Sequence, residues 1–489
     1  MCGWALLPLV AGIPLAASTV LVLRHFYVLG GFWGDSGQIS YVLWHSDLLL
    51  HMPRLDGGGS YFGLHFTPIF VPISWLSRII PLTREQFFAL FVGVCNMMPA
   101  VAVYWLLVSR YLVRCGWAGL LGAAALGLLF AFNGVALAEA RNPHFEMLIV
   151  GSGMMFLVAL VLRRTLLAAV FFVICLASRE DAGFHLFALL VVTLALGHWE
   201  KIKLEQREHI IIFAAIALAY SVAALAAQHV FFPGHSSMRS VYLGSPAFAT
   251  LGWREIGIRV GFFVVYRAYI FLPALMAVGW AIRRRDPFIA AGYIAFIPWG
   301  ILQLVAASWI AGTMSNYYAF PYIFSLFWPL IGCLIGPADF RPSAHEAVAG
   351  FTLMLAASLV GVGFQHNPGH IDLPASFYSL PSPARQQATD GALLRFAASP
   401  QAFGTVAIDG SIGALDSVDF GPQQLLDHAR TSPTDTVIFF DQGYEIGMVR
   451  TLALSAGLNR WYQIPGTSLR VVSNHPLDGV LGLTPASGF

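Results

Sequence analysis

Residues that could carry chemistry lie in short polar stretches between long apolar ones in this 489-residue chain. The first such stretch holds Asp35 between two glycines, in the run WGDSGQ. A carboxylate kept at this place would act as a general base toward a hydroxyl group. The same aspartate would also serve as the N-cap of a helix at the membrane surface, and the sequence leaves both roles open.

Two histidines lie near carboxylates or aromatic residues. His65 falls in the run FGLHFTP, and His144 stands two residues before Glu146. A spacing of two does not share a helix face, but it brings side chains together in an extended segment. His144 and Glu146 are therefore either a hydrogen-bonded structural pair or, together with Asp35, ligands of a divalent cation.

Three consecutive charges, Arg179, Glu180 and Asp181, separate two apolar segments. Charges at such a place are costly against lipid, so they must face water, a cavity or one another. The planar fork of an arginine suits a phosphate, which makes Arg179 a candidate phosphate ligand. A solvated turn between two helices is the alternative.

Later polar stretches add further cations and tyrosines. Arg239 is a second candidate for a phosphate. Arg259 and Arg267 lie in an apolar stretch and would either reach lipid phosphates or bind a phosphorylated lipid substrate. Asn316 and Tyr317 are candidate substrate-binding residues, although interfacial tyrosines are more typical of an aromatic belt.

The composition shows what must position these residues. Hydrophobic residues make up 57% of the chain and charged residues 11%, against about 25% charged in soluble domains. That excludes a soluble enzyme and a disordered chain, and predicts a multi-pass membrane protein. The five cysteines show no metal-ligand spacing and no disulfide framework. No basic patch with interleaved aromatic residues is present, so nucleic acid is not an expected partner.

About eleven membrane helices are expected, since each needs about 20 apolar residues. The first is predicted to be retained rather than cleaved as a signal segment. A short apolar stretch at 68–80 is interrupted by Pro72 and predicts an interfacial or re-entrant helix. The predicted spans are 4–23, 87–109, 117–137, 146–162, 165–178, 182–198, 209–232, 258–281, 287–311, 317–337 and 346–364.

Basic residues in short loops predict the orientation. With the N-terminus in the cytoplasm, eleven basic residues lie in cytoplasmic loops and four in short outer loops. All the candidate residues named above then lie at the outer ends of spans, on one side of the membrane. The inner set is Arg110, Arg114, Arg163, Arg164, Lys201, Lys203, Arg207, Arg283, Arg284, Arg285 and Arg341, and the outer set is Arg141, Arg179, Arg239 and Arg254.

The domain division follows from a change in composition. Residues 1–364 form the predicted membrane domain, in which 24–86 is a long first outer loop with interfacial helices. Residues 365–489 have six basic and ten acidic residues, a net charge of −4. Short apolar runs at 405–408 and 436–440 predict strands of a small α/β domain outside the cytoplasm, in the periplasm of a bacterial inner membrane protein.

At these residues the chain resembles a bacterial family of multi-pass proteins of unknown function, which is placed near the C-type (GT-C) glycosyltransferase superfamily. Asp35, Gly37 and Trp44 match its first-loop pattern, while Ser40 and Tyr41 stand where members often carry an aspartate and a glutamine. The most specific similarity is the run from Phe62 to Pro68, which resembles the family pattern F-G-x-H-F-x-P. Weaker similarities lie at 143–146, 179–181 and 316–321.

The resemblance implies a GT-C-like membrane fold. It also implies transfer of a sugar from a polyprenyl-phosphate donor outside the cytoplasm, with an acidic residue of the first outer loop as base and, in some enzymes, a divalent cation. On this reading Asp35 is the base. His65, His144, Glu146, Glu180 and Asp181 shape the site, and the acceptor is a glycan, lipid or protein. A lipid or glycolipid transporter and a non-catalytic envelope assembly protein are the alternatives.

Overall fold

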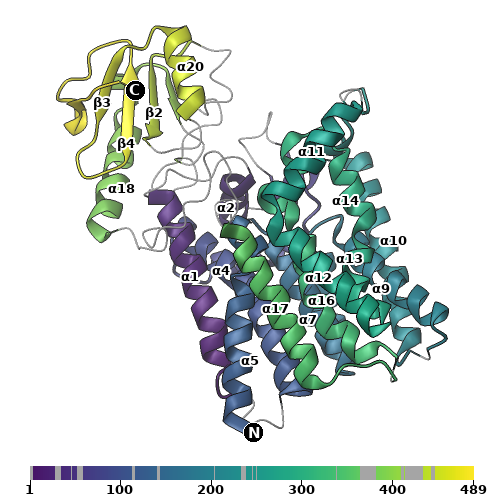
Figure 1. Ribbon diagram of the computed structural model, residues 1–489. Coiled ribbons are helices and arrows are strands. Elements are labelled where there is room, and N and C mark those ends of the chain that lie inside the picture. Colours follow the sequence, from purple (N-terminus) through teal and green to yellow (C-terminus); the bar gives the residue numbers. More distant parts are fainter. Residues whose placement is uncertain are drawn as a thin grey trace. The chain divides into compact units, whose positions relative to one another are not determined.

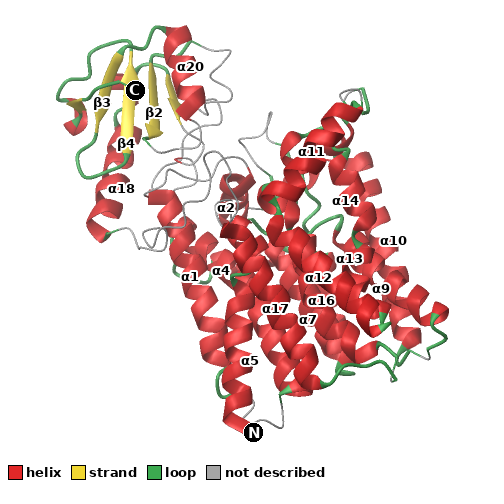
Figure 2. Cartoon of the chain, viewed as in Figure 1, coloured by secondary structure: helices red, strands yellow, loops and turns green. Residues whose placement is uncertain are grey.

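Helices dominate the computed structural model, and a small sheet forms near the C-terminus (Figures 1 and 2). Two compact units are present: Met1–Ala16, Phe62–Ile69 and Gly93–Asp372 in the first, and Ala17–Tyr61, Phe70–Val92 and Leu373–Phe489 in the second. The structure describes residues 4–27, 35–45, 47–51, 59–112, 116–139, 144–202, 204–232, 238–244, 246–248, 251–337, 339–363, 382–408, 412, 433–441 and 446–488, with the backbone alone at 25, 35–38, 45, 138–139, 238–240, 316 and 363.

The first unit is a bundle of apolar helices. Within the described ranges, eight helices of the chain are long and apolar enough to cross a membrane, or nine if one bent pair counts as a span. The helices of this unit, some with a one-turn extension, are α5 (Gly116–Ala131), α6 (Gly134–Glu139), α7 (Glu146–Val161), α8 (Thr165–Leu176), α9 (Ala182–Trp199), α10 (Arg207–Phe231), α11 (Trp253–Tyr266), α12 (Ala268–Arg284), α13 (Ala291–Ala295), α14 (Ile297–Leu304), α15 (Trp309–Gly312), α16 (Pro321–Ile335) and α17 (Ala344–Gly363), with the single turns η3 (Leu107–Tyr111), η4 (Met238–Leu243), η5 (Pro287–Ala290) and η6 (Asn316–Ala319). Two further helices, α1 (Leu7–Tyr27) and α4 (Arg84–Leu106), begin in one unit and end in the other.

The core of this bundle lies along α7 and α16, in which nearly every residue is buried. Other helices expose large apolar side chains instead. Phe231 at the end of α10 is 72% exposed and Ile282 in α12 is 73% exposed. Apolar surface of this extent is typical of helices whose outer face meets lipid.

Every predicted span coincides with one or more helices, but the number eleven is not established. The helices α7 and α8, at 146–162 and 165–178 in the prediction, have 16 and 12 residues. Both are shorter than the about 20 residues that a perpendicular crossing needs. Within the span predicted over 287–311, the helical part ends at Leu304, and only the single turn α15 follows it.

The span predicted over 258–281 is not one continuous helix. The structure has α11 and α12 there, bent by 82° at Arg267. Arg267 has φ −118° and ψ 33°, outside the helical region, and its side chain is fully buried. The mean hydropathy of this stretch shows only that it is apolar. The bend accompanies hydrogen bonds from Arg267 to residues 313–315, which hydropathy does not reveal.

The second unit contains a five-stranded sheet in the order β1-β2-β4-β3-β5. Strands β1 and β2 are parallel and the remaining neighbours are antiparallel. The predicted strands at 405–408 and 436–440 are confirmed as β1 and β2, and α20 packs its apolar face against the sheet through Val449 and Leu452. The elements are α18 (Pro383–Ala398), η8 (Pro400–Phe403), β1 (Val406–Ile408), β2 (Thr436–Phe440), α20 (Ile446–Ala456), β3 (Arg460–Gln463), β4 (Leu469–Ser473), η11 (Val480–Gly482) and β5 (Thr484–Pro485).

Short helices of the long first loop also belong to this unit. They are α2 (Asp35–His45) and α3 (Phe70–Ser77), the latter within the predicted short helix at 68–80. Tyr27 at the end of α1 donates a hydrogen bond to Glu85 of α4, at 3.0 Å between Oη and Oε1. The predicted domain boundary at 364/365 falls in 364–381, which is outside the described residues.

Candidate functional site

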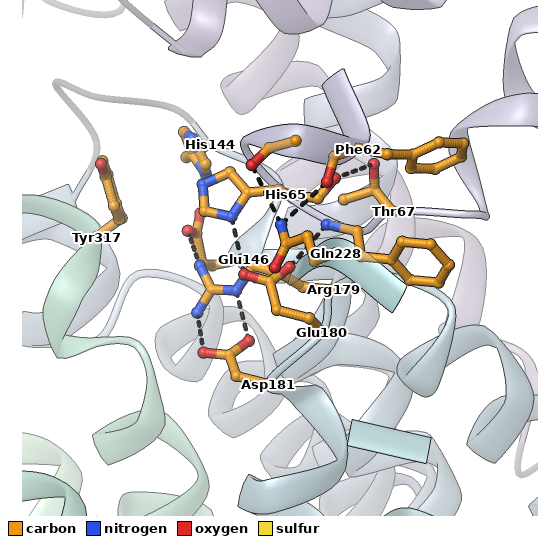
Figure 3. A network of polar contacts seen from close by, with 12 residues as sticks. Phe62, His65, Thr67, His144, Glu146, Arg179, Glu180, Asp181, Gln228 and Tyr317 are labelled. Carbon is orange, nitrogen blue, oxygen red and sulfur yellow. Dashed lines mark hydrogen bonds and ion pairs between the residues drawn. The ribbon is translucent and has the colours of Figure 1, made fainter. Parts of the chain in front are cut away.

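The charged turn between α8 and α9 is the centre of a buried polar network (Figure 3). Arg179 binds Asp181 with two hydrogen bonds, from Nε at 2.5 Å and from Nη2 at 2.6 Å. Its third nitrogen, Nη1, donates to Glu146 at the first turn of α7. All three side chains are more than nine-tenths buried. The charges therefore face one another, which is one of the arrangements that the sequence allowed.

Close packing of α9 on α10 fixes the place of this turn. Gly183 stands two residues after Asp181, and a Cβ atom there would lie 2.1 Å from the backbone oxygen of Ala217 and 2.6 Å from Ser221 Oγ. Only glycine permits this approach. Small residues allow two membrane helices to come together in this way, and here the contact lies next to the charged turn.

Glu146 links the turn to the histidine motif. Glu146 is fully buried, and its second oxygen contacts Nδ1 of His144, which stands just before α7. The sequence left a hydrogen-bonded pair and a metal site as alternatives, and the geometry favours the pair because both carboxylate oxygens of Glu146 have partners.

The FGLHFTP run enters the same network. His65 Nδ1 lies 3.1 Å from Oε1 of Glu180, and the backbone N–H of Phe66 donates to Oε2 of that carboxylate at 2.8 Å. Gln228 of α10 holds the start of the run by donating to the backbone oxygen of Phe62 at 3.0 Å. Residues from three connections between helices thus meet around Arg179, as Figure 3 shows.

Aromatic side chains frame the network on the side of η6. Tyr317 stacks on His144 with ring centroids 4.4 Å apart and an angle of 16° between the planes. Phe320 lies under the guanidinium of Arg179, with 5.1 Å between Cζ and the ring centroid. Residues of the segment 317–320 therefore contact both the histidine and the charged turn.

The electrostatics of the network are those of an acidic site. One guanidinium faces the carboxylates of Glu146, Glu180 and Asp181, so the formal charge is −2 when the histidines are neutral. Burial by itself raises the pKa of Asp181, but Arg179 and His185 hold that pKa well below its usual range. The carboxylate of Asp181 is thus kept ionised.

The expectation that Arg179 binds a donor phosphate stays a prediction, and the described hydrogen bonds of its side chain all go to carboxylates. Its Nε, Nη1 and Nη2 atoms each donate one hydrogen bond to a carboxylate. These bonds use three of the five N–H groups of the guanidinium, and a phosphate that bound the others would lie beside a net negative charge. In the structure Arg179 holds Glu146 and Asp181 in place.

Arg259 and Arg267 also differ from their expected roles. Neither side chain reaches lipid, since they are 3% and 0% exposed. Arg259 donates to the backbone oxygens of Leu304 and Ala306, and Arg267 to those of Thr313 and Met314. Both arginines satisfy backbone groups of an unwound segment, so neither is placed to hold a lipid phosphate.

The side chains of three other predicted site residues lie outside the described part. The backbone of Asp35 begins α2, but its side chain is not described, and the same holds for the side chains of Arg239 and Asn316. Two described residues join the network without having been selected from the sequence. His185 Nε2 lies 3.5 Å from Asp181 Oδ2, and their i, i+4 spacing was a usable signal. The sequence holds no comparable signal for Gln228, because its partner is the backbone oxygen of Phe62, far away in the sequence.

The fit of a divalent cation can be tested on the same residues. No group of three His, Cys, Asp or Glu side chains arranged to hold a metal occurs among the described residues. His144 and Glu146, two of the candidate ligands, bind each other, and Arg179 takes the other oxygen of Glu146. A cation would have to compete with that guanidinium, so these residues do not fit a metal site as arranged.

Comparisons with known proteins find neither a matching family model nor a matching curated protein. Among solved structures, the chain is similar to ArnT from Cupriavidus metallidurans bound to undecaprenyl phosphate, with a TM-score of 0.46 and 14% identity over 99% of each chain. It is also similar to ArnT in the apo state, with a TM-score of 0.40 and 14% identity over 97% of this chain and 98% of that one. Similarity at this level gives no residue of this chain a role.

Proposed function

We propose that the chain is a membrane glycosyltransferase of GT-C type. It moves a sugar from a polyprenyl-phosphate donor to an envelope acceptor on the extracytoplasmic side. The observation that carries the proposal is the convergence of His65, His144 and the charged turn in one buried network. Ionisable groups are costly in a membrane protein, and they are kept where they bind or react.

The reaction would proceed as a single displacement. A hydroxyl oxygen of the acceptor attacks the anomeric carbon, the bond from that carbon to the phosphate oxygen breaks, and polyprenyl phosphate leaves with the electron pair. The hydroxyl proton passes to a carboxylate acting as general base, which we propose to be Asp35. The configuration at the anomeric carbon inverts.

The network would recognise the sugar rather than the phosphate. Carboxylates and histidines bind hydroxyl groups, and a net negative charge disfavours a second anion. In this proposal Arg179 keeps the carboxylates in position, while Arg239 remains the candidate for the donor phosphate. Asn316 and Tyr317 complete the substrate-binding set on the η6 side.

The test is incorporation of label from a polyprenyl-phosphate-linked radioactive sugar into membranes that contain the full chain. Asp35→Asn is expected to abolish incorporation, because an amide cannot accept the proton at neutral pH. Asp47→Asn is the matched control, since Asp47 is exposed and its described bonds are local, to Leu49 and His51. Equal incorporation by Asp35→Asn and wild type would remove Asp35 from the mechanism.

A lipid or glycolipid transporter is the second candidate, and the broken pair α11–α12 favours it, because transporters often bind substrate at interrupted helices. Here, however, Arg267 fills the break and bonds to protein backbone. Mass spectrometry of envelope glycans from a deletion strain separates the two. A missing sugar on an otherwise normal glycan supports the enzyme, and an intact but mislocated glycolipid supports the transporter.

A further inference from the structure

The connection from α14 to η6 is largely unwound, and its backbone groups need partners. Helix α14 ends at Leu304, α15 supplies one turn, and η6 begins at Asn316. Carbonyl groups without partners are costly in an apolar interior. Two buried arginines of the α11–α12 pair satisfy several of them, one at each end of the unwound stretch.

Arg267 holds the end nearest the candidate site. Its Nε donates to the backbone oxygens of Thr313 at 3.0 Å and Met314 at 3.1 Å, and its Nη2 donates to Ser315 Oγ at 2.6 Å. The guanidinium also lies 4.9 Å from the ring centroid of Phe262. A lysine has one nitrogen and cannot reproduce this planar set of contacts.

The segment that Arg267 holds has a strained backbone. Met314 has φ 50°, a left-handed backbone conformation that residues other than glycine rarely adopt. Such a conformation persists only where surrounding contacts impose it. Arg267 donates hydrogen bonds to the backbone oxygen of Met314 and to one oxygen of each neighbouring residue, Thr313 and Ser315. Two residues after Ser315, Tyr317 stacks on His144.

Arg259 holds the other end. Its Nη1 donates to the backbone oxygen of Leu304 at 3.0 Å and to that of Ala306, and its Nε to Glu255 at 3.0 Å. The two carbonyls that it binds lie more than ten residues before Tyr317 in the sequence, although its guanidinium also packs against Gly312. The two arginines therefore provide a comparison, since both are buried and bind carbonyls but only Arg267 forms hydrogen bonds with residues 313–315.

We infer that Arg267 is a positioning residue, which fixes the turn at Met314 and thereby holds Tyr317 against His144. The inference rests on the proposed function only in counting His144 and Tyr317 as parts of a substrate site. Arg267 itself touches no atom of the network around Arg179 in the described contacts. It acts through the backbone of 313–315.

The test is the rate at which diethyl pyrocarbonate modifies His144, followed by mass spectrometry of the full chain in detergent. Arg267→Lys is expected to raise this rate about tenfold, because losing charged hydrogen bonds frees Tyr317 to leave the histidine. The rise should be absent when Arg267→Lys is added to Tyr317→Ala, since the two changes act on the same contact. Arg259→Lys is expected to leave the rate near that of wild type.

His185 is the internal control, because it is 2% exposed and contacts the same charged turn. A general loss of structure would raise the modification of His185 together with that of His144. The proposal is overturned by an equal rise at both histidines, by an unchanged rate at His144, or by an effect that adds to that of Tyr317→Ala.

Ser315→Ala provides a second variant if Arg267→Lys does not fold. It removes the contact with Arg267, together with the hydrogen bond between Ser315 Oγ and Thr313 Oγ1, and it leaves the arginine in place, so a rise of about threefold at His144 is expected. An unchanged rate would again overturn the proposal. The readout is a chemical modification, so it does not depend on the sugar-transfer assay. A failed transfer assay with a positive modification result would reject the proposed function alone.

Discussion

At the scale of single residues, Arg179 partly offsets the negative charge of the network, because it is the cation shared by two buried carboxylates. Removing one partner of a buried ion pair leaves a charge without compensation, which costs about 3–5 kcal/mol. Arg179→Ala is therefore expected to lower the free energy of unfolding by about that amount. Thermal unfolding in detergent, followed by size-exclusion chromatography, measures the loss.

A double variant provides the control for this prediction. Arg179→Met combined with Asp181→Asn removes the cation together with one of the charges that it balances. This pair is expected to be more stable than Arg179→Ala, because less uncompensated charge stays buried. If Arg179→Ala alone unfolds at the wild-type temperature, the ion pairs of the turn contribute little.

Acid is expected to weaken the same turn through Asp181. Burial raises the pKa of this carboxyl, but Arg179 and His185 lower it well below the ordinary 3.8. A depressed folded-state pKa means that the carboxylate stabilises the fold above about pH 4, and that this contribution is lost as the pH falls further. Between pH 5 and 3, wild type should lose stability more steeply than Asp181→Asn. Identical slopes of melting temperature against pH would contradict this.

At the scale of elements, the contact of α9 with α10 sets the position of the turn. Gly183→Ala places a methyl group 2.1 Å from the backbone oxygen of Ala217, so the helices must separate. Overpacking of this kind costs about 1–3 kcal/mol. Gly257→Ala in α11 is the matched control, because a Cβ there meets nothing within 4 Å and alanine favours a helix by up to about 1 kcal/mol. The two substitutions should shift the melting temperature in opposite directions.

The sequence predicts elements better than it predicts breaks between them. Strands β1 and β2 were expected because each is a short apolar run between polar loops. The bend at Arg267 was not, since its cause is a set of hydrogen bonds to residues almost fifty positions later. In the same way, the charges of the turn indicated that Arg179 must have partners, but not that these would include Glu146, which lies 33 positions earlier in the sequence.

At the scale of the whole molecule, the placement of candidate residues on one membrane side was a prediction from loop charges, and the polar network agrees with part of it. His65, His144 and the turn at Arg179 do converge, because the ends of alternate connections between spanning helices lie on the same side. Which side that is, and whether Asp35 shares it, stays a prediction. Hydropathy and the count of basic residues are the arguments for it.

Sidedness can be measured by labelling single cysteines with a reagent that does not cross membranes. Leu454→Cys in α20, where leucine is 86% exposed, and Arg254→Cys at the start of α11 are expected to react in intact spheroplasts. Lys201→Cys, at the exposed end of α9, should react only in inverted vesicles. Cys2 and Cys115 are changed to serine beforehand, while Cys95, Cys175 and Cys333 are buried. If Arg254→Cys and Lys201→Cys react from the same side, helix α10, which lies between them in the sequence, does not cross the membrane, and the predicted alternation of the loops on its two sides is wrong.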